Sequence, residues 1–130
     1  MQKSPKKTFR YKYNKLVRDK IPENIASKPG KTAKYRILND ADFLVELNKK
    51  VLEEANEFIE DNSIEELGDL MEVIGAIMKL KGYKMADVRK KMRAKAAQKG
   101  AFKKKIYLEY VDELNENIAE EIELNKPFRH

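Results

Sequence analysis

Two neighbouring stretches of the chain carry apolar residues at helical spacing. Between Asp42 and Glu60, a single stripe forms at about 100° per residue; its members are Leu44, Leu47, Val51, Ala55 and Phe58. Between Ile64 and Lys81 the apolar arc is broader; its members are Leu67, Leu70, Met71, Val73, Ile74, Ile77, Met78 and Leu80. The pattern predicts two amphipathic helices, of which the second is central and well covered.

Shorter patterns flank this pair. Residues 22–26 favour a short helix with Pro22 early in it, and Met85–Gln98 favours a third helix whose stripe contains Val88 and Met92. The Asn39-Asp40 pair offers the N-cap of the first long helix, and Gly82 is the expected C-cap of the second.

Two segments have the alternation and the residue types of strands, and a third is amphipathic. Residues 34–38 and 102–111 predict a small two-stranded antiparallel ribbon. Residues 112–124 space Leu114, Ile118 and Ile122 four apart, which predicts an extra C-terminal helix. The expected fold is mainly α: a helical bundle at 13–111, after a flexible basic lead-in at 1–12 and before a C-terminal helical extension at 112–130.

Composition narrows the class of protein. A chain of 130 residues suits one domain, and the absence of cysteine excludes disulfides and thiolate metal sites. No apolar run approaches the roughly 20 residues that cross a bilayer, and no signal-peptide pattern opens the chain, so we expect a cytoplasmic protein without a membrane partner. The net charge is +6, yet 22 acidic residues are interspersed with the basic ones, and a nucleic-acid partner is not expected.

Acidic side chains interrupt both apolar stripes. On the first helix Glu54 lies about 20° from Leu47 on the helical wheel, and Glu57 follows one turn along the same side. On the second helix Glu66 and Asp69 are three residues apart and therefore neighbours on one face. Two helices thus each direct a carboxylate pair towards the core.

Buried carboxylates need protonation, basic partners or a bound cation. Clustered carboxylates on facing helices hold divalent metals in helical bundles, and an all-oxygen ligand set suits Mg²⁺, with Mn²⁺ as a substitute. The hypothesis is a magnesium site made by Glu54, Glu57, Glu66 and Asp69. Two structural alternatives remain open: a solvated face on which Glu53 and Glu54 pair with Lys49 and Lys50, and a capping box in which Glu66 reaches back to the Ser63 amide.

Three sequence blocks resemble those of the MazG-like, all-α nucleoside triphosphate pyrophosphohydrolases. The EEANE run at 53–57 and the ELGD run at 66–69 look like the EExxE and ExxD pair of that superfamily. The YNKLVRDKIP run at 13–22 and the KGAF run at 99–102 are similar to signatures of a branch of predicted house-cleaning pyrophosphatases related to phosphoribosyl-ATP pyrophosphohydrolase. Two features depart from the pattern: Ala101 replaces a glycine, and only eight residues separate the acidic motifs, which predicts a tight turn.

The resemblance implies Mg²⁺-dependent hydrolysis of a standard or modified nucleoside triphosphate to the monophosphate and pyrophosphate. Glu53 and Glu54 would be the catalytic carboxylates, with Glu53 holding a second metal or orienting water. Phosphate contacts are expected from the loop cations Lys15, Arg18 and Lys20 and from Lys95 and Lys99 near the end of the third helix.

Two other functions remain open, and the expected assembly is a homo-oligomer. The bundle could be a catalytically silent nucleotide sensor or protein-interaction module, or a basic nucleic-acid-binding accessory protein. The acidic helices are too apolar around their circumference for a monomer of three or four short helices, so a two-fold dimer is the simplest expectation. The superfamily generally forms dimers or tetramers, and a homodimer or homotetramer is expected here.

Overall fold

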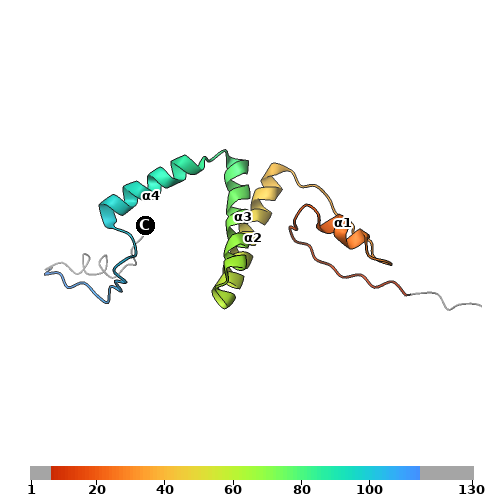
Figure 1. The fold of residues 1–130 in the computed structure, drawn as a ribbon, viewed down its shortest axis with the longest axis horizontal. Coiled ribbons are helices and arrows are strands. Elements are labelled where there is room, and N and C mark those ends of the chain that lie inside the picture. The colour runs from red at the N-terminus through yellow and green to blue at the C-terminus, as the bar shows by residue number, and fades with distance from the viewer. Residues whose placement is uncertain (1–6, 115–130) are drawn as a thin grey trace, which may run out of the picture. The chain divides into compact units, whose positions relative to one another are not determined.

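The fold of the chain, in a computed structural model, is mainly helical, and the structure describes residues 7–114 (Figure 1). Four helices occur in this range: α1 (Ile21–Ala26), α2 (Asp40–Asp61), α3 (Ile64–Lys81) and α4 (Met85–Lys99). All four match helices that the sequence pattern predicts. The chain divides into two compact units, Met1–Arg89 and Lys90–His130, and the candidate site belongs to the first.

A hairpin of α2 and α3 forms the centre of the first unit, and the two helices lie side by side (Figure 1). Asn62 ends α2 in a left-handed conformation, with φ of 51°, and donates its amide to the Phe58 carbonyl. The next residue, Ser63, caps α3 by accepting a hydrogen bond from the Glu66 amide at 3.1 Å. The expected tight turn is confirmed, since these two caps are the whole connection.

The outer ends of the hairpin are also capped as expected. The Asn39 side chain accepts a hydrogen bond from the Asp42 amide at 2.8 Å, which satisfies one of the free donors at the start of α2. Gly82 ends α3 with φ of 73°, a conformation that residues with a Cβ rarely adopt.

The core between α2 and α3 is thin. Among the described residues, the one buried apolar side chain is Leu47, which is 2% exposed. The other apolar residues of the seam, such as Val51, Phe58 and Val73, are half-buried. No described helix combines the length and the apolar character that crossing a membrane requires.

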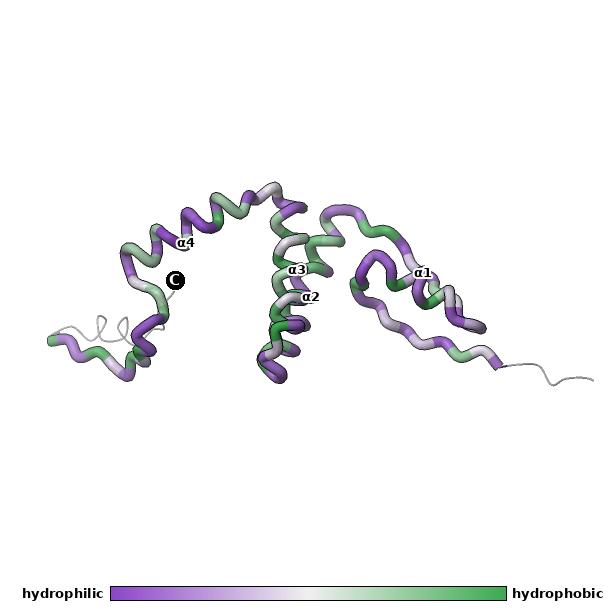
Figure 2. Tube along the Cα trace, viewed as in Figure 1, coloured by the Kyte–Doolittle hydropathy of each residue, from purple (hydrophilic) through white to green (hydrophobic). Residues whose placement is uncertain are grey.

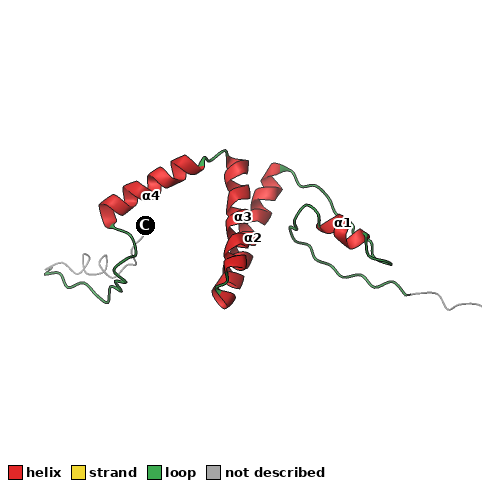
Figure 3. Cartoon of the chain, in the orientation of Figure 1, coloured by secondary structure: helices red, strands yellow, loops and turns green. Residues whose placement is uncertain are grey.

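The expected two-stranded ribbon is not formed, because residues 34–38 and 102–111 are loops (Figure 3). The two segments lie in different units, and strand propensity does not hold an extended segment without a paired neighbour and a packed face. Their large side chains are exposed, as Ile37 and Tyr107 illustrate. The lead-in is non-helical at 7–12, and 112–114 are not helical, whereas 1–6 and most of the expected C-terminal helix, from 115, lie outside the described residues.

The N-cap of α2 yields a first prediction. Asn39→Ala leaves the Asp42 amide without its side-chain acceptor and should lower the free energy of unfolding by about 1 kcal/mol. Asn48→Ala, an exposed position in the interior of α2, should leave it unchanged or raise it slightly, because alanine is the better helix former. Urea denaturation followed by circular dichroism measures both. Equal urea midpoints for Asn39→Ala and the unmodified protein would show that the cap does not contribute to stability.

Candidate metal centre

Three carboxylates meet where α2 and α3 face each other. Glu54 comes from α2, and Glu66 and Asp69 come from the first two turns of α3; one oxygen of each lies within 4.8 Å of the other two. The antiparallel hairpin makes this meeting possible, because it sets the C-terminal half of α2 beside the N-terminal half of α3. This acidic triad has the oxygen donors and the spacing to hold a metal ion.

Burial makes the triad different from a solvated acidic surface. Glu54 is 8% exposed, which makes it the one buried charged residue in the described part of the chain. One carboxylate oxygen of Glu54 and one of Glu66, Oε2 in both cases, are buried and have no hydrogen-bond partner. Leaving a buried acceptor unsatisfied costs about 1–3 kcal/mol, and more when it is charged. The two oxygens therefore have the character of metal ligands.

The pKa values of Glu54 and Glu66 are both raised, which reflects the same excess of buried negative charge. Burial raises the pKa of Glu54, repulsion from Glu57 adds to the rise, and Lys50 offsets part of it. Burial also raises the pKa of Glu66, with further contributions from the charges of Glu57, Asp69 and Glu54. A divalent cation between the carboxylates would reverse both shifts, since it favours the ionised forms.

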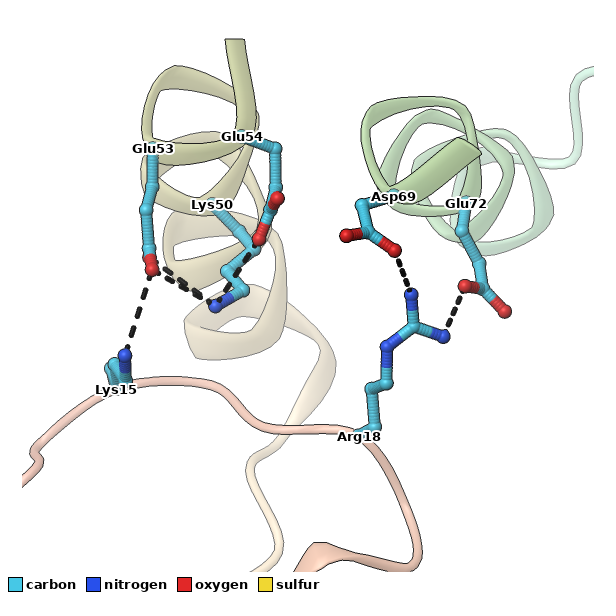
Figure 4. A network of polar contacts seen from close by, with 7 residues as sticks. All are labelled: Lys15, Arg18, Lys50, Glu53, Glu54, Asp69 and Glu72. Atoms are coloured by element: carbon cyan, nitrogen blue, oxygen red, sulfur yellow. Dashed lines mark hydrogen bonds and ion pairs between the residues drawn. The ribbon is translucent and has the colours of Figure 1, made fainter. Parts of the chain in front are cut away.

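Cations border the triad on α2 and on the N-terminal loop (Figure 4). Lys50 Nζ lies 3.6 Å from Glu54 Oε1 and 3.3 Å from Glu53 Oε2, and Lys15 Nζ lies 3.6 Å from Glu53 Oε1. The remaining cation, Arg18, extends from the same loop as Lys15 towards α3.

Arg18 is the most strongly engaged of these cations. Its Nη2 donates to Asp69 Oδ1 at 2.7 Å, and its Nη1 pairs with Glu72 (Figure 4). Hydrogen bonding and charge attraction from Glu72 raise the pKa of the guanidinium above its usual value, with a smaller contribution from Asp69. Arg18 therefore neutralises one edge of the triad, and it does so through an oxygen of a candidate metal ligand.

Two of the expected acidic residues stand at the rim of the triad. Glu57 is exposed and is not among the three that converge, although its charge contributes to the raised pKa values of Glu54 and Glu66. Glu53 is ion-paired with Lys15 and Lys50 on the flank of α2. The structure thus separates a central triad from two acidic neighbours.

The expected phosphate-binding residues fall into two groups. Lys15 and Arg18 lie at the acidic residues, whereas Lys20 precedes α1, is exposed and makes no ion pair within 7–114. Lys95 and Lys99 are exposed residues of α4 and belong to the second unit, so their phosphate role stays a prediction.

The two structural alternatives, a solvated face paired with lysines and a capping box at Ser63, are each supported only in part. Lys50 does pair with Glu53 and Glu54, but Glu54 is buried, and Lys49 pairs with Glu46 instead. The Ser63 hydroxyl caps the Glu66 amide, yet the Glu66 side chain keeps its buried Oε2 unpartnered. Neither alternative satisfies the carboxylates of the triad.

Two residues of the site were missing from the candidates, Lys50 and Glu72. The spacing of Lys50, three and four residues before Glu53 and Glu54, indicates the ion pairs but not that they border a buried carboxylate. Glu72 continues the acidic row one turn beyond Asp69, so the same periodicity that identified Asp69 was sufficient to identify it.

Comparisons of the chain with protein-family models, curated proteins and solved structures gave no match. The resemblance to the MazG-like superfamily therefore rests on the sequence blocks at 13–22, 53–57, 66–69 and 99–102.

The raised pKa values yield a second prediction. A carboxyl whose pKa is raised by folding binds its proton more tightly in the folded state than in the unfolded state, so without metal the free energy of unfolding should fall as pH rises from about 4.5. Glu54→Gln removes one such group. Its free energy of unfolding should therefore depend less steeply on pH than that of the unmodified protein, and its unfolding temperature at neutral pH should be higher. Thermal unfolding in EDTA between pH 4.5 and 8 measures both.

Without metal, Glu54→Gln should have the higher unfolding temperature at neutral pH; with Mn²⁺, the unmodified protein should have the higher one. The metal should stabilise the unmodified protein, by about 2.7 kcal/mol at a concentration 100 times its Kd, and should leave Glu54→Gln nearly unchanged. Glu65→Gln, at an exposed carboxylate of the neighbouring helix α3, is the control and should respond as the unmodified protein does. An equal response of Glu54→Gln to Mn²⁺ would exclude Glu54 as a ligand.

Proposed function

We propose that this protein hydrolyses nucleoside triphosphates to nucleoside monophosphates and pyrophosphate with Mg²⁺, in a house-cleaning role on the nucleotide pool. The observation that carries the proposal is the triad of the buried Glu54 and the half-buried Glu66 and Asp69, with two loop cations beside it. Carboxylates supply metal ligands and cations bind phosphate, and a triphosphate bound through a divalent ion needs both kinds of group.

In this proposal the triad residues bind the metal ion and the loop cations bind the phosphates. Mg²⁺, when bound, offsets the negative charge of the phosphates and lowers the pKa of water. Glu54, Glu66 and Asp69 would hold the ion, and Glu57, whose charge acts on Glu54 and Glu66, would remain at the rim of the site. Lys15 and Arg18 would bind the phosphate oxygens that the ion leaves exposed.

Glu53 is the best candidate for orienting the attacking water. It borders the triad without belonging to it, and Lys15 and Lys50 keep its carboxylate paired. Water would add to the α-phosphorus, the bond from that phosphorus to the bridging oxygen of the β-phosphate would break, and pyrophosphate would leave. The choice of this bond rests on the resemblance of the acidic motifs to the superfamily.

The activity is tested by release of pyrophosphate from standard and modified nucleoside triphosphates with Mg²⁺ or Mn²⁺. Asp69→Asn should reduce kcat/KM at least about 100-fold, because it removes the charge of a metal ligand. The double change Glu54→Gln with Asp69→Asn should abolish turnover. Glu65→Gln should retain the activity of the unmodified protein.

Two results would contradict the proposal. One is the absence of turnover of any nucleotide under both metals, and the other is turnover that survives the double change. Binding of nucleotides without turnover, measured by calorimetry, would favour a sensor instead.

Arg18 gives a prediction with opposite effects on two ligands. Because its guanidinium occupies an oxygen of Asp69, Arg18→Gln should strengthen the binding of Mn²⁺ alone. The same change should raise KM for the triphosphate about tenfold, since it removes a phosphate contact. Calorimetry and steady-state kinetics measure the two effects, with Lys20→Gln as a control that leaves Mn²⁺ binding unchanged. Weaker Mn²⁺ binding in Arg18→Gln would show that Arg18 only organises the ligands.

A further inference from the structure

Glu72 lies beside the candidate metal centre without belonging to it. It follows Asp69 by three residues on α3, so the two carboxylates are neighbours on one face of the helix. Asp69 is a member of the acidic triad, whereas Glu72 is not. Within residues 7–114 the one ion pair of Glu72 is with Arg18. Any role of Glu72 at the site therefore acts through Arg18.

Arg18 binds the two carboxylates through different nitrogens. Its Nη2 donates to Asp69 Oδ1 at 2.7 Å, and its Nη1 pairs with Glu72, so one planar guanidinium spans both side chains (Figure 4). Glu72 contributes more than Asp69 to the raised pKa of Arg18. Glu72 is thus a full partner of Arg18, and this pairing does not depend on Asp69.

Folding stability does not explain the pair of Arg18 and Glu72. The two side chains are 58% and 64% exposed, and ion pairs between exposed side chains add little to the stability of a protein. Arg18 extends from the segment of residues 7–20, which is mostly hydrophilic (Figure 2) and which three ion pairs connect with α2 and α3. These ion pairs determine where the segment lies rather than whether the hairpin folds.

Metal binding would affect the two partners of Arg18 differently. In the proposed site Asp69 is a ligand, and a divalent cation at its oxygen repels the guanidinium. Glu72 lies outside the ligand set and keeps its attraction for Arg18. Arg18 would then lose its contact with Asp69 while Glu72 retains its Nη1. The Nη2 amino group is the part of the guanidinium that becomes available.

We infer that Glu72 is a positioning residue, which holds Arg18 beside the triad so that the freed Nη2 binds a phosphate oxygen of the substrate. The inference rests on the proposed function, whose site it extends by one residue. A guanidinium that is already held through one nitrogen loses less conformational freedom on binding phosphate than an unattached arginine side chain does. Glu72 therefore links the occupation of the metal site to the availability of Arg18.

Binding of inorganic triphosphate with Mg²⁺, measured by calorimetry, tests the inference without requiring turnover. Glu72→Gln should weaken this binding about fivefold, because Arg18 loses its anchor. The opposite sign is expected if Glu72 is only a negative charge near the site, since its removal should then strengthen the binding of an anion. Glu65→Gln, at an exposed carboxylate of the same helix, is the matched control and should bind as the unmodified protein does. Glu72→Asp, which retains the carboxylate, should recover part of the loss.

Combination with Arg18→Gln tests whether Glu72 acts through Arg18. Arg18→Gln alone should weaken triphosphate binding about tenfold. Adding Glu72→Gln should cause no further loss, because no guanidinium remains to be positioned. Unchanged or tighter binding in Glu72→Gln would overturn the inference, and so would losses that multiply in the double change.

A single thiol reports on the position of the loop. The chain has no cysteine, so Leu16→Cys places one reactive group at a half-buried position two residues before Arg18. With Glu72 in place, Mg²⁺ should change the rate of its reaction with a thiol reagent less than about twofold, because the pair with Arg18 persists. With Glu72→Gln, Mg²⁺ should raise the rate at least about fivefold, since neither carboxylate then holds Arg18. Equal responses to Mg²⁺ would overturn the inference.

These results are separable from the proposed activity. In turnover, Glu72→Gln should raise KM about fivefold and leave kcat nearly unchanged, as expected for a lost phosphate contact. Turnover with an unchanged KM would support hydrolysis and overturn the role of Glu72. Absence of turnover, with the expected effects on triphosphate binding and on the thiol, would contradict hydrolysis and support Glu72 as a positioning residue of a phosphate-binding site.

Discussion

Repulsion among three carboxylates that share a space less than 5 Å across is the constraint on which the site depends. Glu54 and Glu66 each keep a buried oxygen without a hydrogen bond, and burial raises the pKa of both groups. Lys50 and Arg18 compensate for part of this charge at the edges of the triad. The residual negative charge lies between the helices, where the three carboxylates could hold a divalent cation.

The α2/α3 hairpin carries both the acidic triad and a set of exposed apolar side chains. One side gathers the carboxylates and receives Lys15 and Arg18 from the N-terminal loop, so charge attraction holds that loop against the helices. Apolar side chains of both helices are exposed elsewhere on the hairpin, among them Leu52 and Met71. A single chain therefore has a site but little core.

Much of this arrangement follows from local pattern. Helical periodicity placed Glu54 and Glu66 on inward faces, and Asn39, Ser63 and Gly82 marked helix ends, because caps depend on neighbouring residues only. The ribbon was wrong because strand formation depends on a partner that local sequence does not specify. Arg18 was expected to meet phosphate, and its ion pair with Asp69 depends on how the loop folds across 51 residues of chain. Periodicity also does not distinguish Glu57, at the rim, from the three carboxylates that converge.

Anomalous scattering from crystals grown with MnCl₂ tests the central claim most directly, because it locates the ion without relying on activity or stability. The account predicts a manganese peak bonded to oxygens of Glu54, Glu66 and Asp69, with Arg18 displaced from the Asp69 oxygen that it now holds. Manganese peaks elsewhere, with the triad still closed by Arg18 and Lys50 and no peak among its oxygens, would contradict it.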